Sequence, residues 1–153
     1  MKGTVLYAKY DEGTGVSVVT KQTKYGTFTR SVRVHPQDKD VANQYDGCYF
    51  AELKCDIAAY KERAKFMRER AKGIQHAFDV ISYANDQTNP HYLNIMSHDW
   101  YLLANQTYIA WRNAEQAYET YTILKESYNA LIETTLRQRR EIRNRIERKH
   151  KSN

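Results

Sequence analysis

The chain has 153 residues, 27% of them charged, with two cysteines and a net charge of +6 at neutral pH. Its length predicts a single domain, and no apolar run approaches the roughly 18 residues that a membrane-spanning helix needs. Cys48 and Cys55 are too far apart in sequence for a CxxC site, and the first residues lack a signal-peptide core, so we expect a reduced, cytoplasmic protein with no membrane partner.

The net charge is concentrated at one end of the chain. Residues 137–151 hold eight Lys or Arg and two acids, whereas the other residues hold 16 bases and 16 acids. This distribution argues against a body that follows a phosphate backbone along its whole length. The C-terminal segment is therefore the candidate for electrostatic binding.

Three runs near the N-terminus alternate with the period of a β-strand, at residues 5–10, 16–23 and 27–34. Glycine-containing stretches separate the runs and predict tight turns. The pattern indicates a three-stranded antiparallel meander over residues 1–35.

One face of this meander is expected to be apolar. Val16 and Val18 share a face of the second run, and Phe28, Val32 and Val34 share a face of the third, with Arg30 among them. Three strands alone are marginal in water, so this face needs a cover. The cover that we expect comes from the distal part of the chain, at Tyr128, Leu131, Ile132 and Leu136.

A polar connector, residues 36–49, leads into two long helical patterns, with Asp46 as the expected N-cap. Apolar residues recur every three or four positions from Phe50 to Ile81, which predicts a helix over residues 50–84. The opposite face of this helix is rich in Lys and Arg and is expected to lie in solvent.

Asn89-Pro90 marks the turn that we expect over residues 85–91. The same three-four spacing then continues, and the absence of Gly and Pro predicts one helix over residues 92–150. A short link makes the two helices antiparallel, so that residues whose numbers add to about 177 face each other. The fold class is thus α+β, a three-stranded β-meander followed by a long, coiled-coil-like helical hairpin.

The second helix is apolar on more than one face, which a two-helix hairpin cannot bury by itself. We therefore expect self-association, as a homodimer or a higher oligomer with a four-helix core. The residues expected to mediate self-association are Trp100, Tyr108, Ile109, Trp111, Tyr118 and Ile123.

Motifs of known chemistry are absent from the sequence, which holds no nucleophile elbow, phosphate-binding glycine loop or HExxH. His91 and His98 lie near the turn, but helical metal ligands usually stand three or four positions apart, so polar residues at a helix start are the favoured interpretation. We expect no catalytic residue, no metal and no cofactor, and a protein that is not an enzyme.

The C-terminal basic segment has two interpretations. Bases suit the last turns of a helix, where they offset its dipole and form i, i+4 pairs. Arginine in excess over lysine instead favours contact with phosphates or with an acidic protein surface. The residues expected to contact a partner or nucleic acid are Arg137, Arg139, Arg140, Arg143, Arg145, Arg148 and Lys149, together with Tyr25, Arg30 and Arg33 near the sheet.

Two stretches, TKYGTFTRSVRVHPQDKD at residues 23–40 and YDGCYFAELKCDI at residues 45–57, carry a YGTF turn, an HPxD connector and a GCxxAE helix start. In these features the chain resembles small accessory proteins of phages and prophages of Gram-positive bacteria. The resemblance implies a non-catalytic protein in a bacterial host cytoplasm that binds and inhibits or modulates a host or antiviral-defence factor, for example a CRISPR effector. Two alternatives stay open, namely a nucleic-acid-binding accessory protein that uses the basic helix, and a sponge for a small nucleotide signal.

Overall fold

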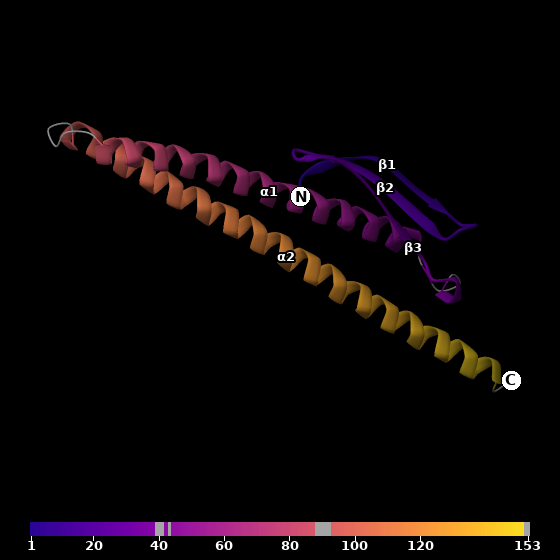
Figure 1. Cartoon of the computed structure of the whole chain (residues 1–153). Helices are drawn as coiled ribbons and strands as arrows, with labels where there is room; N and C mark the ends of the chain where they lie inside the picture. The colour runs from indigo at the N-terminus through magenta and orange to yellow at the C-terminus, as the bar shows by residue number, and fades with distance from the viewer. Residues whose placement is uncertain (39–41, 43, 88–92, 152–153) are drawn as a thin grey trace. The chain divides into compact units, whose positions relative to one another are not determined.

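A computed structural model of the chain describes residues 1–38, 42, 44–87 and 93–151. Its elements are β1 (Gly3–Asp11), β2 (Val16–Thr23), β3 (Gly26–Arg33), the short 3-10 helix η1 (Pro36–Asp38), α1 (Gln44–Gln87) and α2 (Leu93–Lys151), as Figure 1 shows. The predicted α+β fold, a three-stranded meander followed by two long packed helices, is confirmed. Of the predicted turn, residues 85–87 belong to α1 and residues 88–91 lie outside the described part.

The chain forms two compact units, which are described separately. Unit 1 comprises Met1–Tyr60 and Thr122–Asn153, and unit 2 comprises Lys61–Tyr121. Both helices therefore contribute to both units. Within the described residues, no helix is long and apolar enough to span a membrane.

The sheet of unit 1 is antiparallel throughout, in the order β1-β2-β3. In the first turn, the Gly15 amide donates to the Asp11 carbonyl at 2.7 Å, and Gly15 has a φ of 66°, which suits glycine. The β1–β2 register shifts between Val5 and Tyr7, which is a β-bulge at Leu6.

The inner face of the sheet differs from our expectation on β2. The buried side chains there are Ser17, Val19 and Lys21, whereas Val16 and Val18 lie on the opposite face and are only half-buried. The register pairs Ser17 with Val32 and Lys21 with Phe28, so the predicted face of β3 is the inner one. The prediction that Val16 and Val18 face inward was wrong, because two of the three inward side chains of β2 are polar and left no apolar pattern on that face.

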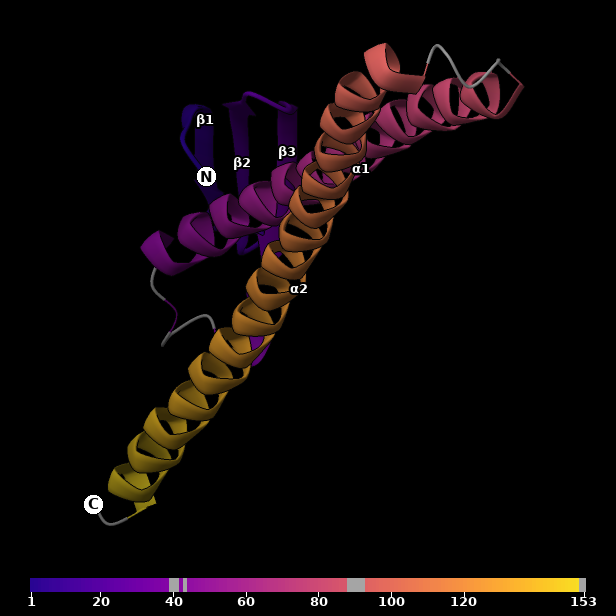
Figure 2. The ribbon, with the colours of Figure 1, turned by 90° about the vertical axis from the view of Figure 1, so that its left-hand side faces the viewer.

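The first part of α1, and not the end of α2, covers the centre of this inner face. Val19 packs with Ala51 and Cys55 of α1, and Phe28 and Val32 lie against the same cluster. Figure 2 shows α1 crossing the strands on one face of the sheet. Burial raises the pKa of the Cys55 thiol, which donates to the Phe28 carbonyl at 3.3 Å.

The first helix also begins earlier than predicted, at Gln44 and not at Phe50. Asp46 is consequently a first-turn residue of α1 and not its N-cap, although an acid still suits this end of the helix dipole. Gly47 lies so close to β2 that a Cβ atom at this position would overlap the Ser17 Oγ atom. The absence of a side chain at Gly47 therefore lets α1 approach the sheet.

In unit 2 the two helices pack along a seam of small residues. Among the residues of this unit whose burial is described, the buried side chains are Ala64, Ala71, Thr107, Ala114 and Ala117. Phe78 and Trp100 face each other with ring centroids 5.4 Å apart, and their numbers add close to the predicted 177. The antiparallel pairing read from the sequence is thus confirmed in its register.

Candidate binding surfaces

Two arginines of the basic segment are used inside unit 1. An Arg139 nitrogen lies 3.6 Å from a carboxylate oxygen of Asp46, and the Arg139 side chain is almost buried. Arg143 donates to the Asp38 carboxylate at 3.1 Å, and that carboxylate is itself buried. These pairs hold the C-terminal part of α2 against η1 and the start of α1, so both residues have a structural role that the sequence did not reveal.

The other predicted contact residues of the basic segment are exposed. They are Arg137, Arg140, Arg145, Arg148 and Lys149. This cluster, which we call the exposed tail cluster, keeps most of the positive charge that the sequence places at this end. It remains a candidate surface for phosphates or for an acidic protein.

The three predicted contact residues of the sheet do not form one surface with each other. Arg30 pairs with Val19 across the strands and Arg33 pairs with Val16, so the two arginines point to opposite faces of β3. Tyr25 is half-buried in the β2–β3 turn. A flat partner could therefore engage Arg30 or Arg33, but not both.

Lys21, whose side chain is buried, forms an ion cluster that sequence reasoning missed. Its ammonium lies 2.7 Å from Glu52 and 2.9 Å from Asp56, both on α1, and Asp56 also lies 3.5 Å from the N-terminal amine of Met1. Burial by itself lowers the pKa of Lys21, but the hydrogen bonds to the two carboxylates more than offset this and raise it above 10.5. The i, i+4 spacing of the two acids was the available signal. The cluster ties β2 to α1.

A hollow of about 780 Å³ lies between β3, α1 and α2 within unit 1. Phe50 and Tyr128 meet there edge to face with centroids 6.2 Å apart, and burial raises the pKa of Tyr128. Ile132 and Leu136 also line this hollow, next to Val32. Three of the four residues that we expected over the sheet thus line the hollow beside β3, whereas Leu131 is exposed.

Two of the predicted self-association residues are engaged inside the hairpin. The Trp100 indole donates to the Ser82 hydroxyl at 3.0 Å, and the Trp111 indole donates to the Gln75 side chain at 3.2 Å. The remaining four, which are Tyr108, Ile109, Tyr118 and Ile123, are exposed.

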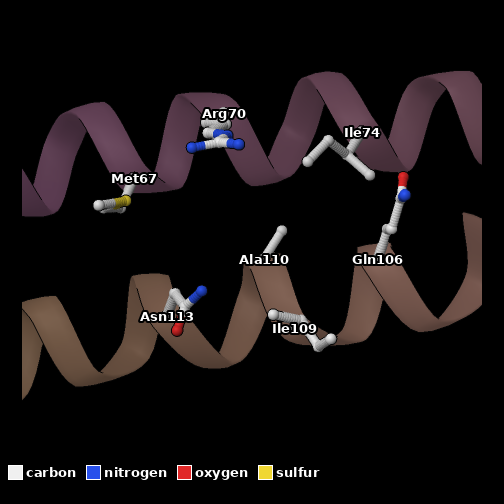
Figure 3. Close-up of a pocket in the computed structure, with 7 residues that line it drawn as sticks. All are labelled: Met67, Arg70, Ile74, Gln106, Ile109, Ala110 and Asn113. Atoms are coloured by element: carbon white, nitrogen blue, oxygen red, sulfur yellow. The ribbon is translucent and has the colours of Figure 1, made fainter.

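One side of the hairpin carries a shallow hollow of about 330 Å³. Figure 3 shows its lining, with Met67, Arg70 and Ile74 on α1 facing Gln106, Ile109, Ala110 and Asn113 on α2. Three lining residues directly precede an alanine of the contact between the helices, namely Arg70, Ile109 and Asn113. This hollow therefore lies on the side of the hairpin formed by the residues that precede the contact positions. The exposed Ile109 therefore lines a partly open hollow whose side chains are both apolar and polar.

The opposite side of the hairpin carries a groove of about 550 Å³, which we call the basic groove. Its lining comprises Lys61, Ala64, Lys65, Arg68, Glu69 and Lys72 from α1, and Trp111, Ala114, Glu115, Tyr118 and Tyr121 from α2. The sequence pattern predicts only a solvated face for its lysines. The sequence did contain a sign of this groove. Four cations of α1 and two aromatic residues of α2 come directly after the positions at which the two helices contact each other, so they lie on the same side of the hairpin.

Metal ligands do not gather in the part of the chain that is described, where no group of three His, Cys, Asp or Glu could hold an ion. His91 lies outside the described residues, as does the side chain of His98. No protein-family model, curated protein or solved structure matches the chain. The resemblance to phage accessory proteins therefore stays a prediction.

Proposed function

We propose that the protein is a non-catalytic accessory protein of the phage type. It binds and inhibits or modulates a bacterial host or antiviral-defence factor, for example a CRISPR effector, and it acts as an oligomer. The observation that carries the proposal is the distribution of apolar side chains in unit 2, where the buried side chains are small and several large apolar side chains are exposed.

Among the described residues of unit 2, the buried side chains are four alanines and one threonine, which are all small. Several large apolar side chains lie at the surface instead, with Tyr108 62% exposed, Ile109 47% exposed and Tyr118 63% exposed. Exposed apolar surface on a helical protein is typical of protein–protein contact. We interpret the hairpin as half of a larger helical assembly.

The proposal is tested by placing a charge on the exposed apolar surface. Ile109→Glu should lower the mass of the full-length protein in light scattering and weaken its binding to a purified CRISPR effector, because a carboxylate resists burial in an apolar interface. Ser127→Glu, at another exposed position of α2, is the matched control and should change neither measurement. A wild-type protein that is monomeric and binds neither the effector nor any protein of a bacterial lysate would refute the proposal.

A second candidate function is nucleic-acid binding through the exposed tail cluster. The observation that favours it is the exposure of five bases on one helix end. Replacing Arg140, Arg145 and Lys149 by Gln removes charge but keeps the two anchoring arginines, which deletion of the whole segment would not. Binding to double-stranded DNA that falls steeply with salt, and that this variant loses, would support the second candidate.

A further inference from the structure

The basic groove has one strongly cationic rim. Lys61, Lys65, Arg68 and Lys72 stand at four-three-four spacing, so they form a continuous stripe of about 16 Å along α1. The Lys72 ammonium lies 3.0 Å from Glu69, which is its acidic partner. The other three form no ion pair with the residues that the structure describes.

The floor and the far wall of the groove have a different chemistry. Ala64 and Ala114 form a low apolar floor between the helices. Trp111, fixed by its hydrogen bond to Gln75, and the tilted pair Tyr118 and Tyr121 form the wall on α2. The groove thus offers an apolar channel with positive charge along one side only.

We infer that the basic groove binds an amphipathic helix of another protein, whose flank over α1 is acidic. The inference rests on the proposed function, because it names the kind of partner segment that the binding protein takes. An incoming helix lays its apolar ridge on Ala64 and Ala114, and acids at helical spacing on its flank reach Lys61, Lys65 and Arg68. This mode completes the hairpin as a three-helix bundle.

A protein helix fits these features better than a nucleic-acid strand does. Single strands bind by stacking successive bases on exposed rings, but Trp111 and Tyr121 are half-buried and only Tyr118 presents most of its ring. Glu115 on the α2 wall would also repel a phosphate backbone that filled the channel. A helix that is acidic on one flank only avoids this repulsion.

The test uses the full-length protein and two labelled probe peptides of about three heptads. One peptide has Leu along its apolar ridge and Glu along one flank, and its twin has Lys in place of Glu. Fluorescence anisotropy should show that the Glu peptide binds at least about tenfold more tightly than its twin. Lys65→Glu combined with Arg68→Glu should weaken the Glu peptide by about tenfold or more and should improve the twin, because charge reversal exchanges attraction for repulsion.

Lys2→Glu combined with Lys125→Glu is the matched control, since it makes the same charge change at exposed positions that do not line the groove. It should leave peptide binding within about twofold. Equal binding of both peptides, no binding of either, or an equal loss in the control overturns the inference. Tighter binding of an oligothymidine that depends on Lys65 and Arg68 overturns it in favour of nucleic acid, and a groove variant that changes the mass of the protein overturns it in favour of a second copy.

The failure of this inference is distinguishable from the failure of the proposed function. Suppose that Lys65→Glu combined with Arg68→Glu binds the purified effector as tightly as the wild type does, whereas Ile109→Glu binds it more weakly. The effector then uses the other side of the hairpin. The groove inference then falls and the proposed function stands.

Discussion

Gly47 is the position at which the packing of α1 on the sheet can be tested most sharply. A Cβ atom at Gly47 would overlap the Ser17 Oγ atom and stand 3.0 Å from the Ser17 Cβ atom. Both approaches are closer than van der Waals contact, so Gly47→Ala requires the helix or the strand to move. We therefore expect this substitution to destabilise unit 1.

The expected magnitude combines two opposing terms. Alanine is a better helix former than glycine by up to about 1 kcal/mol, whereas overpacking of a core typically costs about 1–3 kcal/mol. Gly47→Ala should thus lower the free energy of unfolding by about 1–2 kcal/mol. Gly73→Ala is the matched control in the same helix, because nothing lies within 4 Å of the place that its new Cβ atom would occupy. It should raise the free energy of unfolding by about 0.5–1 kcal/mol.

The assay is urea unfolding of each full-length variant, followed by circular dichroism. Ser17→Ala removes the nearer clashing atom. Because the Ser17 hydroxyl is buried and has no hydrogen-bond partner among the described residues, this substitution alone should be neutral or slightly stabilising. Combined with Gly47→Ala it should recover part of the loss, which a double-mutant cycle measures. If Gly47→Ala stabilises the protein as much as Gly73→Ala does, the close approach of α1 to β2 is refuted.

Three further predictions concern the ion pairs and the buried thiol. Because the pKa of Lys21 is raised in the folded state, its contribution to stability is present below pH 10.5 and is lost as the pH rises through the folded-state pKa. The melting temperature of Lys21→Met should therefore fall less steeply with rising alkaline pH than that of the wild type. Arg139→Ala should cost about 1–2 kcal/mol in chemical unfolding, whereas Arg140→Ala should stay within about 0.5 kcal/mol, because only the first side chain is almost buried and paired. A thiol reagent at neutral pH should modify Cys55 much more slowly than Cys48, which mass spectrometry of the folded protein would show; equal rates would contradict the burial and raised pKa of Cys55.

The elements that the sequence predicted well are those with regular and local patterns. The three-four spacing of apolar residues predicted both helices. It also predicted that residues whose numbers add to about 177 face each other, as Phe78 and Trp100 do. The alternation of β3 gave the inward direction of Phe28 and Val32. These patterns succeed because a helix or strand buries one face, and the burial leaves its period in the sequence.

The features that the sequence did not yield depend on partners that lie far away in the chain. Ser17 and Lys21 face inward although they are polar, because Gly47 makes room for the first and α1 supplies two carboxylates to the second. Arg139 and Arg143 resemble their exposed neighbours, and only their pairing with acids about 100 positions earlier separates them. Hydrophobic periodicity carries no information about such pairs.

The bulge in β1 has a consequence for how the protein behaves at high concentration. β1 is an edge strand with Val5, Leu6 and Tyr7 exposed, and an apolar edge of this kind can recruit strands of other chains into aggregates. The shift in register at Leu6 bends the strand and breaks the even row of free amide and carbonyl groups. Straightening β1 by deleting Leu6 would therefore be expected to favour aggregation, even though it shortens the exposed apolar run.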